Sequence, residues 1–262
     1  MLSIVTVTFK NLPCLVKTIS SILSECKSSN SLQIIVVDGA AESTVANYIK
    51  SIKLSSSVEF VLVSEPDHGI YDAMNKGLRL ARGQHIIYMN SGDCFHAGGL
   101  ALFLSQPRDP AVLYYGDAEF YQDDALSFGF KANMQRARDF LRHNCFSHQA
   151  IFYPTALLQS LGGYRLDFAI SADFDLTWRC WRSGCRFEQL GAVIADCELG
   201  GISCQRGLQS YADRVASFQA SGAWHYALLL KAYYPIFLAK NLLVRRLEGS
   251  RLLAIYRKYK VR

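Results

Sequence analysis

Tyr88-Met89-Asn90-Ser91-Gly92-Asp93 is the stretch from which the fold of this 262-residue chain can be predicted. The apolar run that leads into it, from His85 to Met89, is typical of a buried strand, and the strand ends in a polar turn that closes with a carboxylate. In open α/β sheets, ligands bind beyond the carboxyl ends of the strands, where an Asp can hold a divalent cation against phosphate oxygens. Asn, Ser, Gly and Asp are also ordinary turn formers, so these residues alone leave a binding site and a plain turn equally open.

Three more predicted strands precede this stretch, and acidic residues follow two of them. Strands are expected at residues 2–9, 32–37, 58–63 and 85–89, and helices at residues 12–23, 43–52 and 70–81. Apolar strands that alternate with helices predict an α/β fold with a mostly parallel sheet flanked by helices. Because parallel strands end at one edge of a sheet, we expect Asp38, Glu65 and Asp67 to lie near Asp93.

The pattern weakens after Asp93. Strands are expected at residues 112–117, 150–153 and 186–195, helices at residues 157–161 and 171–181, and an irregular region at residues 118–147. From about residue 208 the composition favours helices, and we expect Pro235 to break or kink the one that contains it. We therefore expect one α/β domain over residues 1–205 and a helical, basic segment over residues 206–262.

Composition narrows the class of protein. Half of the residues are apolar, which excludes general disorder. The net charge is +6. Residues 240–262 contain eight Lys or Arg and one acid, a balance of 8 − 1 = +7, so the rest of the chain sums to −1. Because the basic residues gather in the C-terminal segment, nucleic acid is not expected as a partner. The eight cysteines form no Cys-x-x-Cys pair, so neither a zinc site nor a redox motif is expected. We expect the cysteines to be reduced thiols in a cytoplasmic compartment. The N-terminus lacks the basic region of a signal peptide, and no run of 18 uncharged apolar residues predicts a membrane span.

Apolar and basic residues interleave in the C-terminal segment, from residue 224 to residue 262. This pattern is typical of a helix that lies on an anionic membrane surface. A basic helix packed on its own core and a helix that binds a protein partner remain as alternatives. The oligomeric state cannot be predicted.

Other polar residues have both a structural and a functional interpretation. Asp173 lies in the first turn of a predicted helix. It is either a general base or an acid that only complements the helix dipole, which is the role expected of Asp175. His148 is either an ordinary hydrogen-bonded histidine or a substrate contact. Gly200 and Gly201 form either a plain turn or an anion-binding nest of backbone amides.

Four motifs occur in order along the chain, namely Ser3-Ile4-Val5-Thr6-Val7-Thr8-Phe9, Val36-Val37-Asp38-Gly39, Ser64-Glu65-Pro66-Asp67-x-Gly69-Ile70-Tyr71-Asp72-Ala73-Met74-Asn75-Lys76-Gly77 and Asn90-Ser91-Gly92-Asp93. This series resembles the family 2 inverting glycosyltransferases, which have the GT-A (Rossmann-like) fold. The third motif is similar to the branch that builds colanic acid, other exopolysaccharides and lipopolysaccharide. The resemblance covers residues 2 to about 203.

The resemblance implies a sugar transfer from a UDP-, GDP- or dTDP-sugar to a glycan or lipid-linked oligosaccharide acceptor, at the inner face of a bacterial cell membrane. It implies that Asp93 holds Mg²⁺ or Mn²⁺ and that Asp173 is the catalytic base. His148, Gln149, Gly200 and Gly201 are implied on the acceptor or donor side. The donor side is implied to comprise Thr8, Phe9, Asp38, Glu65, Asp67, Asp72, Asn90, Ser91, Gly92 and Asp93.

The chain departs from the family pattern at two acids. Asn90 stands in place of the first acid of the metal motif, and Ala172 in place of the acid before the base. Weak metal binding without nucleotide is therefore expected, since one carboxylate plus substrate phosphates would hold the ion. These departures also keep open a non-catalytic subunit that binds nucleotide sugars at a membrane surface. A sugar nucleotidyltransferase agrees less well, because no Gly-rich loop follows the first strand.

Overall fold

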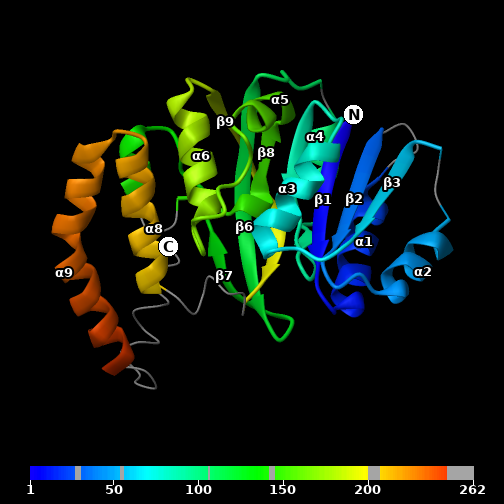
Figure 1. Ribbon diagram of the computed structural model, residues 1–262, viewed down its shortest axis with the longest axis horizontal. Coiled ribbons are helices and arrows are strands. Elements are labelled where there is room, and N and C mark those ends of the chain that lie inside the picture. The colour runs from blue at the N-terminus through cyan, green and yellow to red at the C-terminus, as the bar shows by residue number, and fades with distance from the viewer. Residues whose placement is uncertain (27–30, 54–55, 106, 142–144, 200–206, 247–262) are drawn as a thin grey trace.

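The computed structural model describes residues 1–26, 31–53, 56–105, 107–141, 145–199 and 207–246. In this part of the chain a mixed sheet, with strand order β3-β2-β1-β4-β8-β6-β9-β5 and with β7 paired to β6, separates two layers of helices (Figure 1). The parallel strands of its first half are β1 (Leu2–Thr8), β2 (Leu32–Asp38), β3 (Val58–Ser64) and β4 (His85–Tyr88). The intervening helices are α1 (Leu12–Glu25), α2 (Ser43–Ser51) and α3 (Ile70–Leu80). This half confirms the expected mostly parallel α/β sheet.

Most residues of the parallel strands are apolar because both faces of these strands are covered. In β1, Val5 and Val7 belong to one core cluster, which also contains residues of α3. The alternate residues Leu2 and Ile4 belong to a second core cluster, which also contains residues of α1. Successive side chains of a strand point to opposite faces, so a strand between two helical layers carries apolar residues on both of its faces.

The second half of the sheet is mixed. β8 is antiparallel to both β4 and β6, whereas β6 runs parallel to β9. The strands are β5 (Cys94–Phe95), β6 (Val112–Gln122), β7 (Ala125–Phe130), β8 (Ile151–Pro154) and β9 (Arg186–Glu198). The helices are α4 (Gly99–Leu104), α5 (Thr155–Ser160) and α6 (Ala172–Arg182), with 3₁₀ turns η1 (Ala137–Leu141) and η2 (His148–Ala150).

The expectation of an irregular region over residues 118–147 is wrong for its first part. β6 continues to Gln122 and forms a hairpin with β7. The two residues of the turn, Asp123 and Asp124, have φ angles of 51° and 61°. A two-residue hairpin turn with positive φ at both positions usually carries Asn-Gly or Asp-Gly. Asp-Asp adopts it here without glycine, so the usual sequence signal was missing.

The C-terminal helices pack on the same core as α6. These helices are α8 (Gly207–Ala220) and α9 (Trp224–Arg246). The ring of Phe218 in α8 makes edge contacts with Phe174 and Trp178 of α6, with centroids 5.4 Å and 4.9 Å apart. None of the described helices is both long and apolar enough to cross a membrane.

Of the expected break or kink at Pro235, the break is wrong, because α9 continues through it to Arg246. A kink at Pro235 stays a prediction. Proline removes one intrahelical hydrogen bond. Pro235 and Lys231, four residues before it, are exposed, so water can reach the carbonyl group that loses its donor. The remainder of the predicted basic segment, residues 247–262, lies outside the described residues.

Candidate active site

The carboxyl ends of the parallel strands meet at one edge of the sheet, as the sequence predicts. Thr8, Asp38 and Ser64 are register partners on β1, β2 and β3. The turn after β4 lies beside them, because the Ser91 amide donates to the Val7 carbonyl at 3.2 Å and the Thr8 and Ser91 hydroxyl oxygens are 3.4 Å apart. Four segments of the predicted donor side are thereby brought together.

Asp38 is fully buried and organises the loop that follows β2. Its two carboxylate oxygens accept hydrogen bonds from the amides of Ala40 at 3.1 Å and Glu42 at 2.9 Å. Gly39 lies directly under the carboxylate of Asp67, where a Cβ atom on Gly39 would overlap it. The loops after β2 and β3 therefore touch. Phe9, at the end of β1, is exposed at the same edge.

Lys76 of α3 connects the remaining acids of the predicted donor side. Its Nζ atom lies 2.9 Å from Glu65 Oε1 and 3.9 Å from Asp72 Oδ2, and it donates to the Pro66 carbonyl at 2.6 Å. Asp72 in turn accepts the His68 amide at 3.0 Å. These contacts hold the start of α3 against the loop after β3.

Asp93 is the buried end of the turn that follows β4. Gln149 Nε2 donates to its Oδ2 atom at 2.9 Å, and the Glu198 amide donates to its Oδ1 atom at 3.1 Å. Burial raises the pKa of Asp93, and the hydrogen bond from Gln149 opposes that shift. Gln149 is itself oriented, because its Oε1 atom accepts the Ser147 hydroxyl at 2.7 Å. The Asp93 carboxylate is thus positioned by residues from two distant parts of the chain.

His148 lies between Asn90 and Asp173. Its Nε2 atom is 3.2 Å from Asn90 Nδ2, and its Nδ1 atom is 3.6 Å from Asp173 Oδ2. With an amide donor at one nitrogen, the histidine accepts through Nε2 and carries its proton on Nδ1, toward Asp173. The structure therefore joins the turn that bears Asp93 to the predicted base.

Asp173 and Asp175 both lie in the first turn of α6 and differ in exposure. The Asp173 side chain is 28% exposed and accepts the Phe174 amide at 2.8 Å. The Asp175 side chain is 1% exposed and forms an ion pair with Arg179 at 2.7 Å, and it also accepts the Ser217 hydroxyl at 2.8 Å. Asp175 is therefore structural, whereas the half-buried side chain of Asp173 is partly accessible to solvent.

The segment before α6 is held from two sides. Asp213 of α8 accepts the backbone amides of Ile170 at 2.9 Å and Ser171 at 3.1 Å. From the other side, the Tyr71 hydroxyl of α3 donates to the Ile170 carbonyl. Both contacts fix the backbone from which Asp173 projects.

The turn of residues 90–93 has the donor atoms that a Mg²⁺ or Mn²⁺ ion requires. Asn90 Oδ1 is buried and, among the described residues, has no hydrogen-bond partner. An unsatisfied buried oxygen is costly unless a ligand completes it. Together with the Asp93 carboxylate it offers two hard oxygen ligands, so the remaining positions would come from water and phosphate.

Two contributors to this site were not predicted. The Thr18 hydroxyl of α1 donates to the Asp93 carbonyl at 2.7 Å and accepts the Gly92 amide at 3.0 Å, and Glu198 supplies the amide to Asp93. A hydroxyl on the apolar stripe of α1 was a usable signal for Thr18, whereas Glu198 carried none. Gly200 and Gly201 lie outside the described residues.

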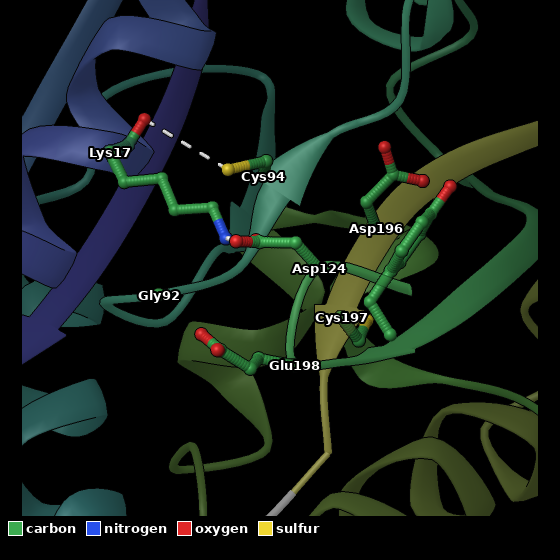
Figure 2. Close-up of a pocket in the computed structure, with 8 residues that line it drawn as sticks. Lys17, Gly92, Cys94, Asp124, Asp196, Cys197 and Glu198 are labelled. Carbon is green, nitrogen blue, oxygen red and sulfur yellow. Dashed lines mark hydrogen bonds and ion pairs between the residues drawn. The ribbon is translucent and has the colours of Figure 1, made fainter. Parts of the chain in front are cut away.

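A cavity of about 260 Å³ opens beside the turn of Asp93 (Figure 2). Across it, Lys17 of α1 extends to Asp124 of the β6–β7 hairpin, 3.7 Å away. The lining residues are Lys17, Gly92, Cys94, Tyr121, Asp124, Asp196, Cys197 and Glu198.

A scan against family models matches residues 3–158 to Glycosyl transferase family 2. This chain belongs to that family. It is a glycosyltransferase with the GT-A fold, and the matched residues include the strand ends, the turn of Asp93 and the His148-Gln149 pair. The expectation drawn from the four motifs is confirmed at this level.

The chain is similar to curated bacterial glycosyltransferases. A "PGL/p-HBAD biosynthesis glycosyltransferase" of Mycobacterium bovis is 26% identical over 197 residues, which cover 71% of this chain and 75% of that protein. An uncharacterized glycosyltransferase of Mycobacterium tuberculosis is 27% identical over 210 residues, covering 78% of this chain and 77% of that one.

Solved structures share the fold of this family 2 enzyme at low identity. The crystal structure of S. aureus TarS 1-349 in complex with UDP-GlcNAc has a TM-score of 0.61 and 13% identity, covering 83% of this chain and 66% of that one. The mannosyltransferase PcManGT from Pyrobaculum calidifontis, in complex with GDP-Man and Mn²⁺, has a TM-score of 0.59 and 18% identity, covering 98% of this chain and 84% of that one.

Proposed function

We propose that this enzyme transfers a sugar from a nucleoside-diphosphate sugar to a hydroxyl group of a glycan acceptor, with inversion at the anomeric carbon. One observation carries the proposal: His148 connects the half-buried carboxylate of Asp173 to Asn90 of the turn that bears Asp93. A base and a diphosphate site are thereby adjacent, and an inverting transfer needs both at the same bond.

Asp173 would act as the general base. Its Oδ2 atom accepts the proton of the acceptor hydroxyl while the hydroxyl oxygen attacks the anomeric carbon, and the Phe174 amide holds Oδ1. A positioned base of this kind contributes about 10²–10⁴-fold to a rate. A single displacement on the face opposite the diphosphate inverts the configuration.

Asp93 and Asn90 would hold the Mg²⁺ or Mn²⁺ ion. When bound, the ion supplies positive charge to the leaving diphosphate. Gln149 and the Glu198 amide keep the Asp93 carboxylate in one orientation for this task. The Mn²⁺ and GDP-Man present in the PcManGT structure support this assignment, although likeness at 18% identity shows only the fold.

The donor side would comprise the predicted loops at the ends of β1, β2 and β3. The exposed ring of Phe9 provides a surface on which a base can stack, and the loops of Asp38 and Asp67 border it along the sheet edge. Glu65 and Asp72 form ion pairs with Lys76, so their proposed role is to position the start of α3.

We also propose a lipid-linked glycan acceptor, used in the assembly of bacterial surface glycans at the inner face of the cell membrane. Large apolar side chains are exposed along α9, which suits a helix lying in a bilayer interface beside anionic lipid. These residues are Trp224, Leu228, Leu229, Tyr233, Ile236 and Leu238. The named mycobacterial relatives support a bacterial glycan pathway.

The test is a panel of UDP-, GDP- and dTDP-sugars with Mg²⁺ or Mn²⁺, monitored by thermal shift and by release of the nucleoside diphosphate. Asp173→Asn should bind the active donor as the wild type does and lose about 10²–10⁴-fold in turnover. Asp167→Asn, an exposed acid on the loop before α6, is the matched control and should keep its activity.

Three outcomes would contradict the proposal. Absence of both binding and turnover across the panel would exclude a nucleotide-sugar enzyme. Binding of a donor with no turnover by the wild type, with candidate acceptors present, would favour the non-catalytic subunit. Full activity of Asp173→Asn would exclude Asp173 as the base.

A further inference from the structure

We infer that His96, Glu119 and Asp196 form a binding site for a divalent transition-metal cation, separate from the turn of Asn90 and Asp93. His96 follows β5, Glu119 lies on β6 and Asp196 lies on β9. Each of the three residues offers one ligand atom, and these atoms all lie within 4.8 Å of one another. The site is independent of the proposed transfer reaction.

The distances show a ligand set that is already assembled. His96 Nδ1 lies 2.8 Å from Asp196 Oδ1 and 4.0 Å from Glu119 Oε2. All three side chains are half-buried, so they are held by the strands and still reachable by an ion from solvent. A cation at the centre needs only small adjustments of the side chains, because ligand atoms about 2.0–2.2 Å from a metal lie 3–4 Å from one another.

The strand register gives an independent reason for a cation here. Glu119 and Asp196 are direct partners in the parallel pairing of β6 with β9. Like charges directly opposite each other on neighbouring strands are destabilising. Both carboxylates lie within reach of His96, so the cluster carries two negative charges whenever the imidazole is neutral. A divalent ion would neutralise both carboxylates at once.

The donor set selects the kind of ion. One imidazole nitrogen and two carboxylate oxygens suit first-row divalent ions such as Mn²⁺, Co²⁺ and Zn²⁺ better than Mg²⁺, which prefers oxygen ligands. The Tyr121 hydroxyl donates to Glu119 Oε2 at 2.7 Å and fixes that carboxylate from outside. Outer hydrogen bonds of this kind orient metal ligands.

The location suggests what the ion does. Asp196 and Tyr121 line the cavity beside the turn of Asp93, and the Asp196 carboxylate points away from that of Glu198 (Figure 2). An ion at this position would tie the ends of β5, β6 and β9 together next to the active site. Its effect on the protein is therefore expected in stability, through ligand binding to the folded state alone.

The test is calorimetric and spectroscopic titration of the protein with Co²⁺ alone, without nucleotide. The wild type should bind one equivalent with the visible absorption of a nitrogen- and oxygen-ligated ion, and Co²⁺ should raise its melting temperature. Asp93→Asn should keep this binding. His96→Gln and Glu119→Gln should each weaken it at least about tenfold, which corresponds to about 1.4 kcal/mol. His225→Gln, an exposed histidine on α9, is the matched control and should bind as the wild type does.

Two results would overturn the inference. The first is an absence of Co²⁺ binding by the wild type, which would leave His96 only as a hydrogen-bond partner of Asp196. The second is binding that survives in both His96→Gln and Glu119→Gln and is lost in Asp93→Asn. If one variant fails to fold, as judged by its circular dichroism spectrum, the other variant and Asp196→Asn decide the result.

Discussion

His148 Nδ1 lies 3.6 Å from Asp173 Oδ2, and this pair joins the proposed donor half of the active site to its proposed acceptor half. The other ring nitrogen of His148 faces the Asn90 amide, so the imidazole has one partner on each side. The turn that bears Asp93 and the proposed base are therefore connected through a single imidazole ring.

Substitution of His148 by Gln is expected to lower kcat by about 10–100-fold, because Asp173 loses the group that fixes its Oδ2 atom, and this loss should be smaller than that of removing the base. The KM for the donor and the melting temperature should change little. Steady-state kinetics over a range of pH checks this, with His225→Gln as the control. A variant whose kcat matches the wild type would show that His148 has no part in positioning the base.

Asp175→Ala is expected to lower stability rather than turnover per folded molecule. The buried Asp175 carboxylate forms an ion pair with Arg179. Removal of the carboxylate leaves the positive charge of Arg179 without this partner. Breaking a buried ion pair in this way costs about 3–5 kcal/mol. Urea unfolding measures the loss, and Asp173→Asn serves as the comparison because the Asp173 side chain is 28% exposed whereas that of Asp175 is 1% exposed. Equal stability of Asp175→Ala and the wild type would contradict the structural role.

His85 gives the protein a pH-dependent stability. It is buried between Phe103 and Tyr114, and its Nε2–H group donates to the Val112 carbonyl at 2.9 Å. Burial lowers the pKa of His85 below its ordinary value of 6.5. Below about pH 6.5 His85 therefore binds a proton in the unfolded chain but not in the folded protein. The contribution of neutral His85 to the free energy of unfolding is lost as the pH falls toward the folded pKa.

The free energy of unfolding should accordingly fall between pH 7.5 and pH 5.5, by at most about 1.4 kcal/mol per pH unit from this one group. Urea unfolding at several pH values measures the slope. His85→Gln, which does not titrate, should have a smaller slope over the same interval. An unchanged slope in the variant would assign the pH dependence to other groups.

The proposed membrane contact predicts a position-specific effect of charge. Leu228 on α9 is 65% exposed, and Leu126 on the β7 hairpin strand is 55% exposed. Leu228→Glu should weaken binding to vesicles of anionic lipid by about tenfold or more, because a carboxylate replaces buried apolar contact and is repelled by the lipid charge. Leu126→Glu should bind as the wild type does. Vesicle sedimentation decides, and equal effects of both substitutions would contradict a membrane face on α9.

The first half of the fold could be predicted because its signals are local. Alternating apolar strands and amphipathic helices up to Tyr88 need only short-range patterns, and parallel strands necessarily bring Thr8 and Asp38 to one edge. The second half mixes strand directions, and its hairpin turn uses Asp123-Asp124 instead of a glycine turn. Such features depend on pairings between distant parts of the chain.

The candidate site shows the same division. Asp93 could be predicted from its place after a strand, but its hydrogen bonds from Gln149 and Glu198 arise only from tertiary contacts. Asp173 and Asp175 are alike in sequence, since both lie in one helical turn. Only the burial of Asp175 against Arg179 separates this structural acid from the half-buried Asp173.

The hydrogen bonds from Ile170 and Ser171 to Asp213 limit where this enzyme can be truncated or fused to a relative in a chimera. Helix α8 lies beyond the family match at residues 3–158, and it nevertheless holds the backbone that carries Asp173. A shortened or hybrid enzyme should therefore keep its own chain to at least Ala220. Replacement of the chain after residue 205 by that of a relative would remove Asp213, which accepts the hydrogen bonds from Ile170 and Ser171 just before the proposed base.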